Sequence, residues 1–161
     1  MKKEFYRTET FGFKGSARSL EKRKEIVQKY KENRLSLDGA VLVGRHPRIG
    51  DYSKISDSNI DNFCILGEHV NVERSAIMDA AKIGDYAHVS DSILGRKVVV
   101  ESTRENPVRI ESTSVIGNAV HIRKGCKLIR TKVNYGLMIP PDMTYIDKFL
   151  QNYEDVAKLA S

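Results

Sequence analysis

The sequence predicts an all-β solenoid, a parallel β-helix of about six coils with a helix at each end. Two observations carry this prediction. Aliphatic residues recur in steps of six, six and five, which gives a period of seventeen residues. Small or compact residues recur four places after the aliphatic ones, where the chain turns a corner into the interior. Such a period is typical of coils that stack about 4.8 Å apart.

Both columns continue along most of the chain. The register is displaced by five residues within Glu101 to Arg109 and then resumes. The aliphatic column consists of Val43, Ile49, Ile55, Ile60, Leu66, Val72, Ile77, Ile83, Val89, Leu94, Val100, Ile116, Ile122, Leu128, Val133 and Ile139. Both cysteines, Cys64 and Cys126, fall in the small-residue column, so we expect them in the core rather than in a disulfide or a zinc site.

Glycine directly follows six of the aliphatic residues, and we expect tight turns with positive φ there. These glycines are Gly44, Gly50, Gly67, Gly84, Gly95 and Gly117. On the five-residue side, a column of small hydroxyl residues comprises Ser58, Ser75, Ser92 and Thr131. Both patterns are those of a chain that turns a corner in the same way in every coil.

Both ends of the chain carry helical patterns. Residues 18–33 predict an amphipathic helix, whose apolar stripe is Leu20, Ile26, Val27 and Tyr30. Near the other end, Pro140 and Pro141 break the strand pattern, and Thr144 with Asp147 resembles a capping box. We therefore expect a capping helix with Phe149, Leu150, Tyr153, Val156 and Ala157 on one face. The predicted division is a basic arm and helix at 1–36, the β-helix at 37–145 and the capping helix at 146–161.

The net charge of +6 is confined to residues 1–36, which hold eleven basic and five acidic residues. A solvated helix face is the ordinary explanation of such an arm, with binding of an acidic partner as the alternative, and nucleic acid is not favoured. No run of apolar residues is long enough to cross a membrane, and the amino terminus is polar. We expect a cytoplasmic protein without membrane contact.

Four histidines are the first candidates for chemistry: His46, His69, His88 and His121. His69 lies seventeen residues from both Tyr52 and Tyr86, which predicts an exterior stack of three rings. His88 and His121 each precede a core aliphatic residue and should point outward, so they are weak candidates for a catalytic base. Their spacing does not suit a three-histidine metal site, and we expect no metal and no cofactor.

The segment 101–109 is the candidate functional loop. Its Arg104, Glu105 and Arg109 are candidate ligands for a phosphate or carboxylate, although a solvated loop with internal ion pairs is the simpler interpretation. Two charged columns repeat at seventeen-residue offsets. Asp57, Arg74 and Asp91 alternate in sign and should pair across coils. Asp51, Glu68 and Asp85 share one sign, so this column needs cations or neighbouring Lys and Arg side chains, and we expect the pKa values of the three carboxyl groups to be raised.

Three segments resemble the carboxy-terminal domain of sugar-1-phosphate nucleotidylyltransferases. They are SerIleLeuGlyArg at 92–96, SerValIleGlyAsn at 114–118 and LeuMetIleProProAspMetThrTyrIle at 137–146. The resemblance spans roughly residues 37–146 and extends to archaeal glucose-1-phosphate thymidylyltransferase, relatives of mannose-1-phosphate guanylyltransferase and proteins like ADP-glucose pyrophosphorylase. It implies a hexapeptide-repeat β-helix of left-handed sense, against the usual right-handed crossover rule, and a homo-oligomer, by analogy a trimer.

The catalytic half of those enzymes binds nucleotide through a glycine-rich loop with a basic residue and holds magnesium with acidic residues. Residues 1–36 supply no such site, and PheGlyPheLysGlySer at 11–16 is only a weak echo. Translation initiation factor two-B subunits are similar in architecture and lack the sugar chemistry. We therefore expect a non-catalytic oligomerisation or regulatory module of nucleotide-sugar biosynthesis, with a nucleotidylyltransferase catalytic subunit as candidate partner. The alternatives are a hexapeptide-repeat acetyltransferase for a sugar or amino sugar, and a scaffold that binds an acidic partner through its basic arm.

Overall fold

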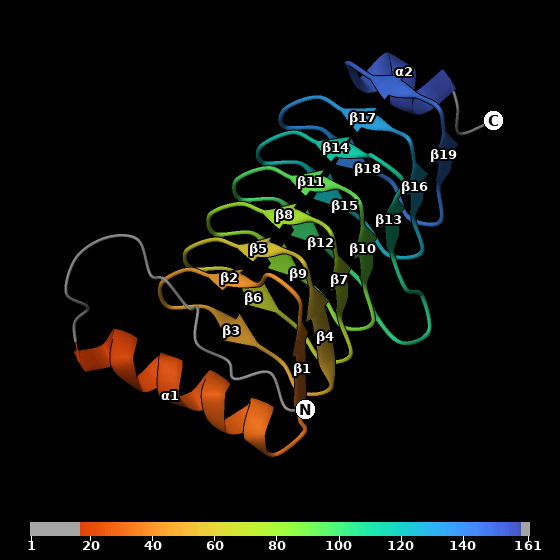
Figure 1. Cartoon of the computed structure of the whole chain (residues 1–161). Helices are drawn as coiled ribbons and strands as arrows, with labels where there is room; N and C mark the ends of the chain where they lie inside the picture. The colour runs from red at the N-terminus through yellow and green to blue at the C-terminus, as the bar shows by residue number, and fades with distance from the viewer. Residues whose placement is uncertain (1–16, 159–161) are drawn as a thin grey trace.

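The computed structural model describes residues 17–158, with side chains from residue 21, as a parallel β-helix whose coils wind in the left-handed sense (Figure 1). The chain begins with α1 (Ala17–Lys31) and ends with α2 (Tyr153–Lys158). Between them, short strands form three flat sheets, each of which is one side of a triangular prism. The predicted fold class is confirmed.

The sheets are named here by their first strands. Sheet A contains β1 (Leu35–Asp38), β4 (Ser53–Ser56), β7 (Asn71–Glu73), β10 (His88–Ser90), β13 (Arg109–Glu111), β16 (Lys127–Ile129) and β19 (Thr144–Ile146). Sheet B contains β2 (Leu42–Val43), β5 (Asn59–Ile60), β8 (Ala76–Ile77), β11 (Ile93–Leu94), β14 (Val115–Ile116), β17 (Lys132–Val133) and β20 (Phe149–Leu150). Sheet C contains β3 (Arg48–Ile49), β6 (Ile65–Leu66), β9 (Lys82–Ile83), β12 (Val99–Val100), β15 (His121–Ile122) and β18 (Met138–Ile139).

The predicted columns form the core. In each two-residue strand the second residue points inward and is buried, while the first faces outward, because successive side chains in a strand alternate between its faces. Every residue of the predicted aliphatic column is buried. Cys64 and Cys126 are free and buried as expected, and burial raises the pKa of the Cys64 thiol to about 11.

The corners of the prism depend on left-handed backbone at residues that carry side chains. Among the described residues, seventeen non-glycine positions have φ between 43° and 64°. The prediction that glycines supply this conformation is wrong, because positive φ falls two residues later, at Tyr52 after Gly50 and at His69 after Gly67. The glycines serve close approach instead, since a Cβ on Gly50 would lie 2.3 Å from the carbonyl of Gly67 on the next coil.

Sheets A and B each contain seven strands, so the β-helix has about seven coils rather than the six predicted. The first strand does not follow the seventeen-residue period, because Leu37 pairs with Ile55, eighteen residues further on. The last coil continues the period, with Tyr145 beside Leu128 and Leu150 beside Val133. The last coil was not predicted because Tyr145 is aromatic and stands at a position where the other coils have an aliphatic residue.

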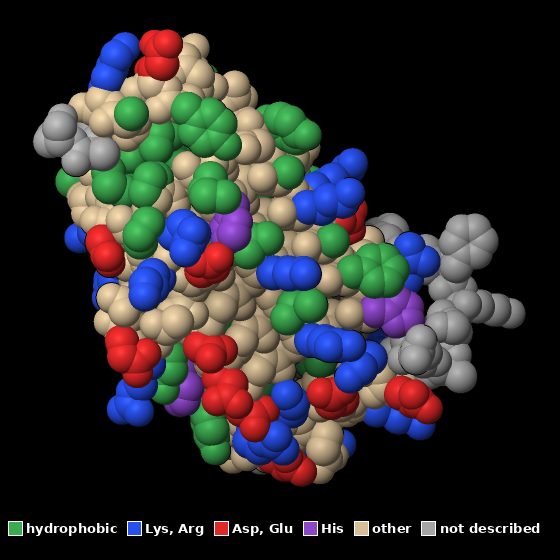
Figure 2. Space-filling view, turned by 180° about the vertical axis from the view of Figure 1, so that it is seen from behind, with side chains coloured by type: hydrophobic (Ala, Val, Ile, Leu, Met, Phe, Trp, Pro, Cys, Tyr) green, Lys and Arg blue, Asp and Glu red, His purple; other side chains and the backbone are tan. Residues whose placement is uncertain are grey.

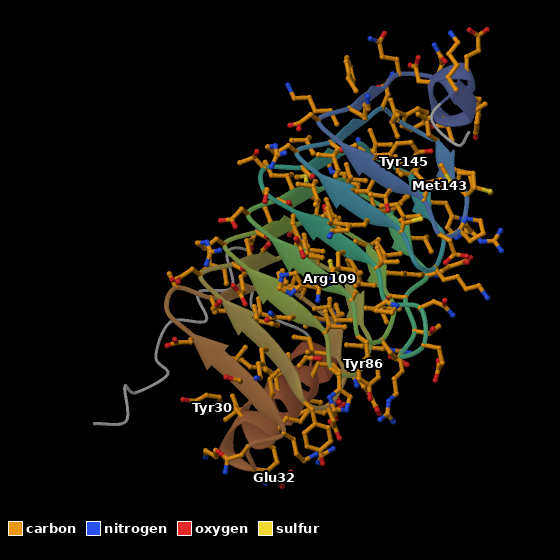
Figure 3. The ribbon with its side chains drawn as sticks, turned by 90° about the vertical axis from the view of Figure 1, so that its right-hand side faces the viewer. Tyr30, Glu32, Tyr86, Arg109, Met143 and Tyr145 are labelled. Carbon is orange, nitrogen blue, oxygen red and sulfur yellow. The ribbon has the colours of Figure 1, made fainter. Side chains whose placement is uncertain are left out.

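The C-terminal helix begins later than predicted. Thr144 lies in β19 rather than at a helix cap, and the two prolines do not end the β-helix. The cap is Asn152, whose Oδ1 accepts hydrogen bonds from the backbone N–H groups of Glu154 (2.9 Å) and Asp155 (3.1 Å). Val156 of α2 is buried over the final coil, and its carbonyl accepts a hydrogen bond of 3.1 Å from the Tyr145 hydroxyl, at the end of the prism seen in Figure 3.

At the other end, α1 closes the first coil through Ile26, which is buried, and Tyr30, which packs against the core (Figure 3). Lys29 Nζ donates a hydrogen bond of 2.8 Å to the carbonyl of Ile49 and lies 3.0 Å from Asp51, which Arg34 also binds at 2.6 Å. Hydrogen bonds from Arg34, and then from Lys29, lower the pKa of Asp51. The expected rise in pKa is therefore wrong for Asp51. Leu20 of the predicted stripe, and residues 1–16, lie outside the described side chains.

Replacing Gly50 by Ala is expected to destabilise the fold by about 3 kcal/mol or more, because backbone of the next coil occupies the space that the methyl group needs. Gly136→Ala is the matched control. Gly136 has φ of 70° with open space around it, so Ala should cost only about 1–2 kcal/mol of backbone strain. Urea denaturation measures both values. The interpretation of Gly50 fails if Gly136→Ala is the more destabilised variant.

Asp51→Asn tests how α1 is fastened. Since the pKa of Asp51 lies below its ordinary 3.8, the ionised carboxylate stabilises the folded chain fully above about pH 4, and this contribution is lost as the pH falls through the lowered pKa. The difference in free energy of unfolding between wild type and Asp51→Asn should therefore shrink below pH 4. The same comparison in an Arg34→Gln background should show a smaller pH dependence, and an unchanged one would contradict the assignment.

Candidate functional site

One loop interrupts the smooth surface of the prism, at the corner between sheets C and A (Figure 1). Its extent differs from the prediction. His88 pairs with Arg109, twenty-one residues later, so four of the five extra residues lie in the loop at 101–108. The fifth lies at the next corner, where Ser112 and Thr113 both have positive φ. Ser102 anchors the loop by accepting a hydrogen bond of 3.0 Å from the backbone N–H of Val108.

The three candidate ligands of this segment have different surroundings. The Arg104 guanidinium lies 5.9 Å from the centre of the Tyr86 ring. Arg109 belongs to strand β13 rather than to the loop, and its Nη1 lies 3.2 Å from Glu111 Oε1. Glu105 is exposed. Figure 3 shows Arg109 over sheet A and Tyr86 at the corner beside it. Binding of phosphate or carboxylate at these residues stays a prediction.

The predicted aromatic stack is confirmed. The His69 ring lies between those of Tyr52 and Tyr86, with centroid distances of 5.2 and 4.6 Å. Arg104 extends the same column toward the loop. A second stack at another corner pairs His46 with Phe63 at 5.3 Å. This pair was not predicted, although the offset of seventeen residues between His46 and Phe63 indicates it.

His121 belongs to a cluster at the base of the loop. Its Nε2 lies 2.7 Å from Glu101 Oε1, and the other oxygen of Glu101 lies 2.7 Å from Arg123 Nε. Glu101 directly follows strand β12 in one coil, whereas His121 and Arg123 belong to the next coil. A carboxylate bound to one ring nitrogen fixes the orientation of an imidazole. The cluster thus has two of the parts that a general base requires.

His88 lies on a different sheet and has different partners. Its Nδ1 lies 3.1 Å from Asn71 Nδ2, and its Nε2 lies 3.8 Å from Glu111 Oε1. The predicted outward orientation of His88 and His121 is confirmed, since both side chains are about one third exposed. His88 belongs to sheet A and His121 to sheet C, so they do not form one site. Within residues 17–158 no three His, Cys, Asp or Glu residues form a group that would hold a metal ion.

Charged pairs run along the corner between sheets A and B. Arg74 binds Asp91 with two hydrogen bonds, of 2.6 and 2.8 Å, as the alternating charges predicted. Arg130 and Asp147 repeat the arrangement near the C-terminal end, at 2.5 and 2.8 Å. The hydrogen bonds lower the pKa of both carboxyl groups and raise that of both guanidinium groups. Asp57 instead accepts a hydrogen bond of 3.0 Å from the backbone N–H of Ala40.

Exposed apolar side chains also lie on the flat sides of the prism, a feature that the sequence analysis missed. On sheet B they include Leu42, Ile93, Val115 and Phe149, with exposed fractions between 41% and 56%. On sheet C, Ile65 and Met138 are exposed, and Figure 2 shows hydrophobic side chains gathering toward the C-terminal end of that side. The signal was present, because each of these residues directly precedes a buried aliphatic residue in a two-residue strand.

The described helices are too short or too polar to cross a membrane. No curated protein matches the sequence significantly. A proposed acetyltransferase from Bacillus cereus is similar with a TM-score of 0.38 and 13% identity, over 79% of this chain and 80% of its own. The acetyltransferase domain of PglB from Neisseria gonorrhoeae, in complex with acetyl coenzyme A, gives a TM-score of 0.33 and 16% identity, over 80% of this chain and 63% of its own.

A family model gives the informative match. The model of the EIF2B subunit epsilon LbH domain, where LbH denotes a left-handed β-helix, matches residues 23–128. That range runs from α1 to the strands beyond the loop and makes up well over half of the chain. The match agrees with the coil handedness and with the hexapeptide-type repeat. The chain therefore belongs to the family of left-handed β-helix domains of the EIF2B epsilon subunit type, which are related to the C-terminal domains of nucleotidyltransferases.

Proposed function

We propose that this chain is a non-catalytic assembly module that joins protein chains through the flat sides of its β-helix. The observation that carries the proposal is the row of exposed apolar side chains on sheet B, where Leu42, Ile93 and Phe149 are each more than 40% exposed. Contiguous exposed apolar patches on a folded domain mark sites of protein association, and Ile93 and Val115 are direct neighbours on this sheet. The family supports the same function, since its model describes a domain of a subunit and so of a larger assembly.

The surroundings of the histidines favour assembly over catalysis. His121 is 33% and Glu101 41% exposed on an open sheet surface, so water reaches the pair from outside. A base that acts on an acyl donor works best in a cleft that excludes water. Arg123 beside the pair is bound to Glu101, and Arg109 on sheet A is bound to Glu111.

The basic arm contributes less charge to a partner than its composition indicated. Lys29 and Arg34 both bind Asp51 within the chain, and Lys22 pairs with Glu25. Lys29 and Arg34 fasten the end of α1 to the first coil, whereas the pair of Lys22 and Glu25 lies within the helix. The partner that we propose is therefore met by the sheets and not by the arm. By the family resemblance, the candidates are further copies of this chain, with three as the expected number, and a nucleotidylyltransferase catalytic subunit.

The purified chain is expected to be a homo-oligomer without transferase activity. Light scattering coupled to size exclusion measures its mass across a dilution series. Parallel assays should show no acetyl transfer from acetyl coenzyme A to amino sugars, and no pyrophosphate release from a nucleoside triphosphate with a sugar 1-phosphate. A monomer at all concentrations contradicts the assembly function, and pyrophosphate release contradicts the absence of catalysis.

Acyl transfer is the second candidate, favoured by the 2.7 Å contact between His121 and Glu101 beside the loop. If acetyl transfer is observed, His121→Asn should abolish it, while His88→Asn on the other sheet should leave it unchanged. Glu101→Gln should lower the rate without abolishing it, because the carboxylate orients the imidazole and does not react. Activity that survives His121→Asn would exclude this site as its source.

A further inference from the structure

The outward column of sheet B is self-complementary when it is reversed. Its members are the first residues of the seven strands, held in register by the strand pairing: Leu42, Asn59, Ala76, Ile93, Val115, Lys132 and Phe149. Ile93 stands at the centre. The order of residue types is the same on both sides of Ile93. A small or medium apolar residue (Ala76 or Val115) comes first, then a polar residue (Asn59 or Lys132), and then a large apolar residue (Leu42 or Phe149). The column is exposed along the side of the prism that faces the viewer in Figure 1.

The two halves of this column differ in relief. A shallow groove follows the N-terminal half, from Leu42 to Ile93, because Asn59 and Ala76 are small. The C-terminal half carries bulkier side chains, Val115, Lys132 and Phe149. A hollow half and a raised half on one surface fit each other when a second copy is laid on it in the reversed direction. Ala76 then lies opposite Val115, and Leu42 lies opposite Phe149.

The charged rim of the groove supports the same arrangement. The corner beside sheet B carries Asp57 before β5 and Arg130 before β17, and these two strands face each other in the reversed pairing. Each Asp57 thus lies opposite an Arg130 of the other copy, twice per pair, and faces its Nη1, because Nε and Nη2 of Arg130 bind Asp147 of the same chain. The two Asp91 carboxylates approach each other at the centre, but each is held by two hydrogen bonds from its own Arg74, which offset the repulsion.

We propose that two copies of this chain associate through sheet B, with their β-helix axes antiparallel and a twofold axis passing beside Ile93. The inference deepens the proposed assembly function and rests on it. It replaces the expected threefold order, because in a ring of three each copy presents one surface to a different surface of its neighbour. A ring of three therefore does not bring a self-complementary surface into contact with itself. A twofold dimer does, because both copies use the same surface.

The size of the sheet fits a stable but dissociable pair. Seven coils at 4.8 Å spacing are roughly 29 Å long, and one side of a coil measures roughly 20 Å. The interface would then bury roughly 1,200 Å² in total, at the lower end of the range for specific complexes. Pairing in this manner covers four exposed apolar side chains per copy, namely Leu42, Ile93, Val115 and Phe149.

Ile93→Arg is the decisive variant, because one substitution brings two charges together at the twofold axis. The mass measured by light scattering should fall from two chains to one. Ile65→Arg is the matched control, since Ile65 is also an exposed first residue of a two-residue strand, on sheet C, and its mass should stay that of two chains. Both side chains are exposed, so circular dichroism should show the wild-type fold for both variants, while the thermal midpoint should fall only for Ile93→Arg, which loses the stabilisation by association.

A cross-linking test reads the direction of the pairing. With a short bis-maleimide, Leu42→Cys alone and Phe149→Cys alone should give monomers, a mixture of the two should give dimers, and Ile93→Cys alone should also give dimers. The native thiols are buried, so the wild-type protein serves as the blank. Self-linking of Leu42→Cys would overturn the antiparallel arrangement, as would an unchanged mass of Ile93→Arg. A wild-type mass of three chains overturns this pairing but not the assembly function, whereas a monomeric wild type overturns both.

Discussion

The hydrogen bonds between backbones of successive coils are the constraint on which the rest of the structure depends. In every sheet, N–H groups of one coil donate to carbonyls one coil away, as Lys54 does to Val70 and Asn71 to Ala87, at 2.8 and 2.9 Å. In most coils the partner is one repeat away, so each side chain stacks on its equivalent. Aliphatic columns inside, aromatic and charged columns at the corners and the outward row of sheet B all follow from this one repeat.

Local sequence predicts such a fold well wherever the repeat is regular. The aliphatic core, the buried cysteines, the stack around His69 and the pair of Arg74 with Asp91 were all predictable from offsets of seventeen residues. Errors arose where the offset or the residue type changes. Leu37 lies one residue out of period and Tyr145 is aromatic, so strand β1 of the first coil and strands β19 and β20 of the last coil were missed. The role of glycine was predicted wrongly because a sequence shows only that a glycine is present. It does not show whether the missing Cβ allows a positive φ or the close approach of another coil.

The candidate site shows a similar limit. Glu101 and His121 are twenty residues apart, an offset that belongs to no column because the inserted loop lies between them. Only the folded chain brings them together. Likewise, the contact of Lys29 with Asp51 joins a helix to a coil at an offset that belongs to no column, although Arg34 binds the same carboxylate at an offset of seventeen residues. Predictable contacts here are those between equivalent positions, and the contacts that distinguish this chain from a generic β-helix join positions that are not equivalent.

The divided insertion has a consequence for how this fold diversifies. Four extra residues at one corner and one at the next leave every buried column in register on both sides, so length is absorbed where the chain already turns. Each corner is thus a place where an evolving gene can lengthen or shorten the chain without disturbing the interior. New binding segments can be inserted at one corner at a time, while the spacing of the strands on the flat sides stays the same for any protein bound there. Insertions can therefore change the surface of the domain without changing the packing of its core.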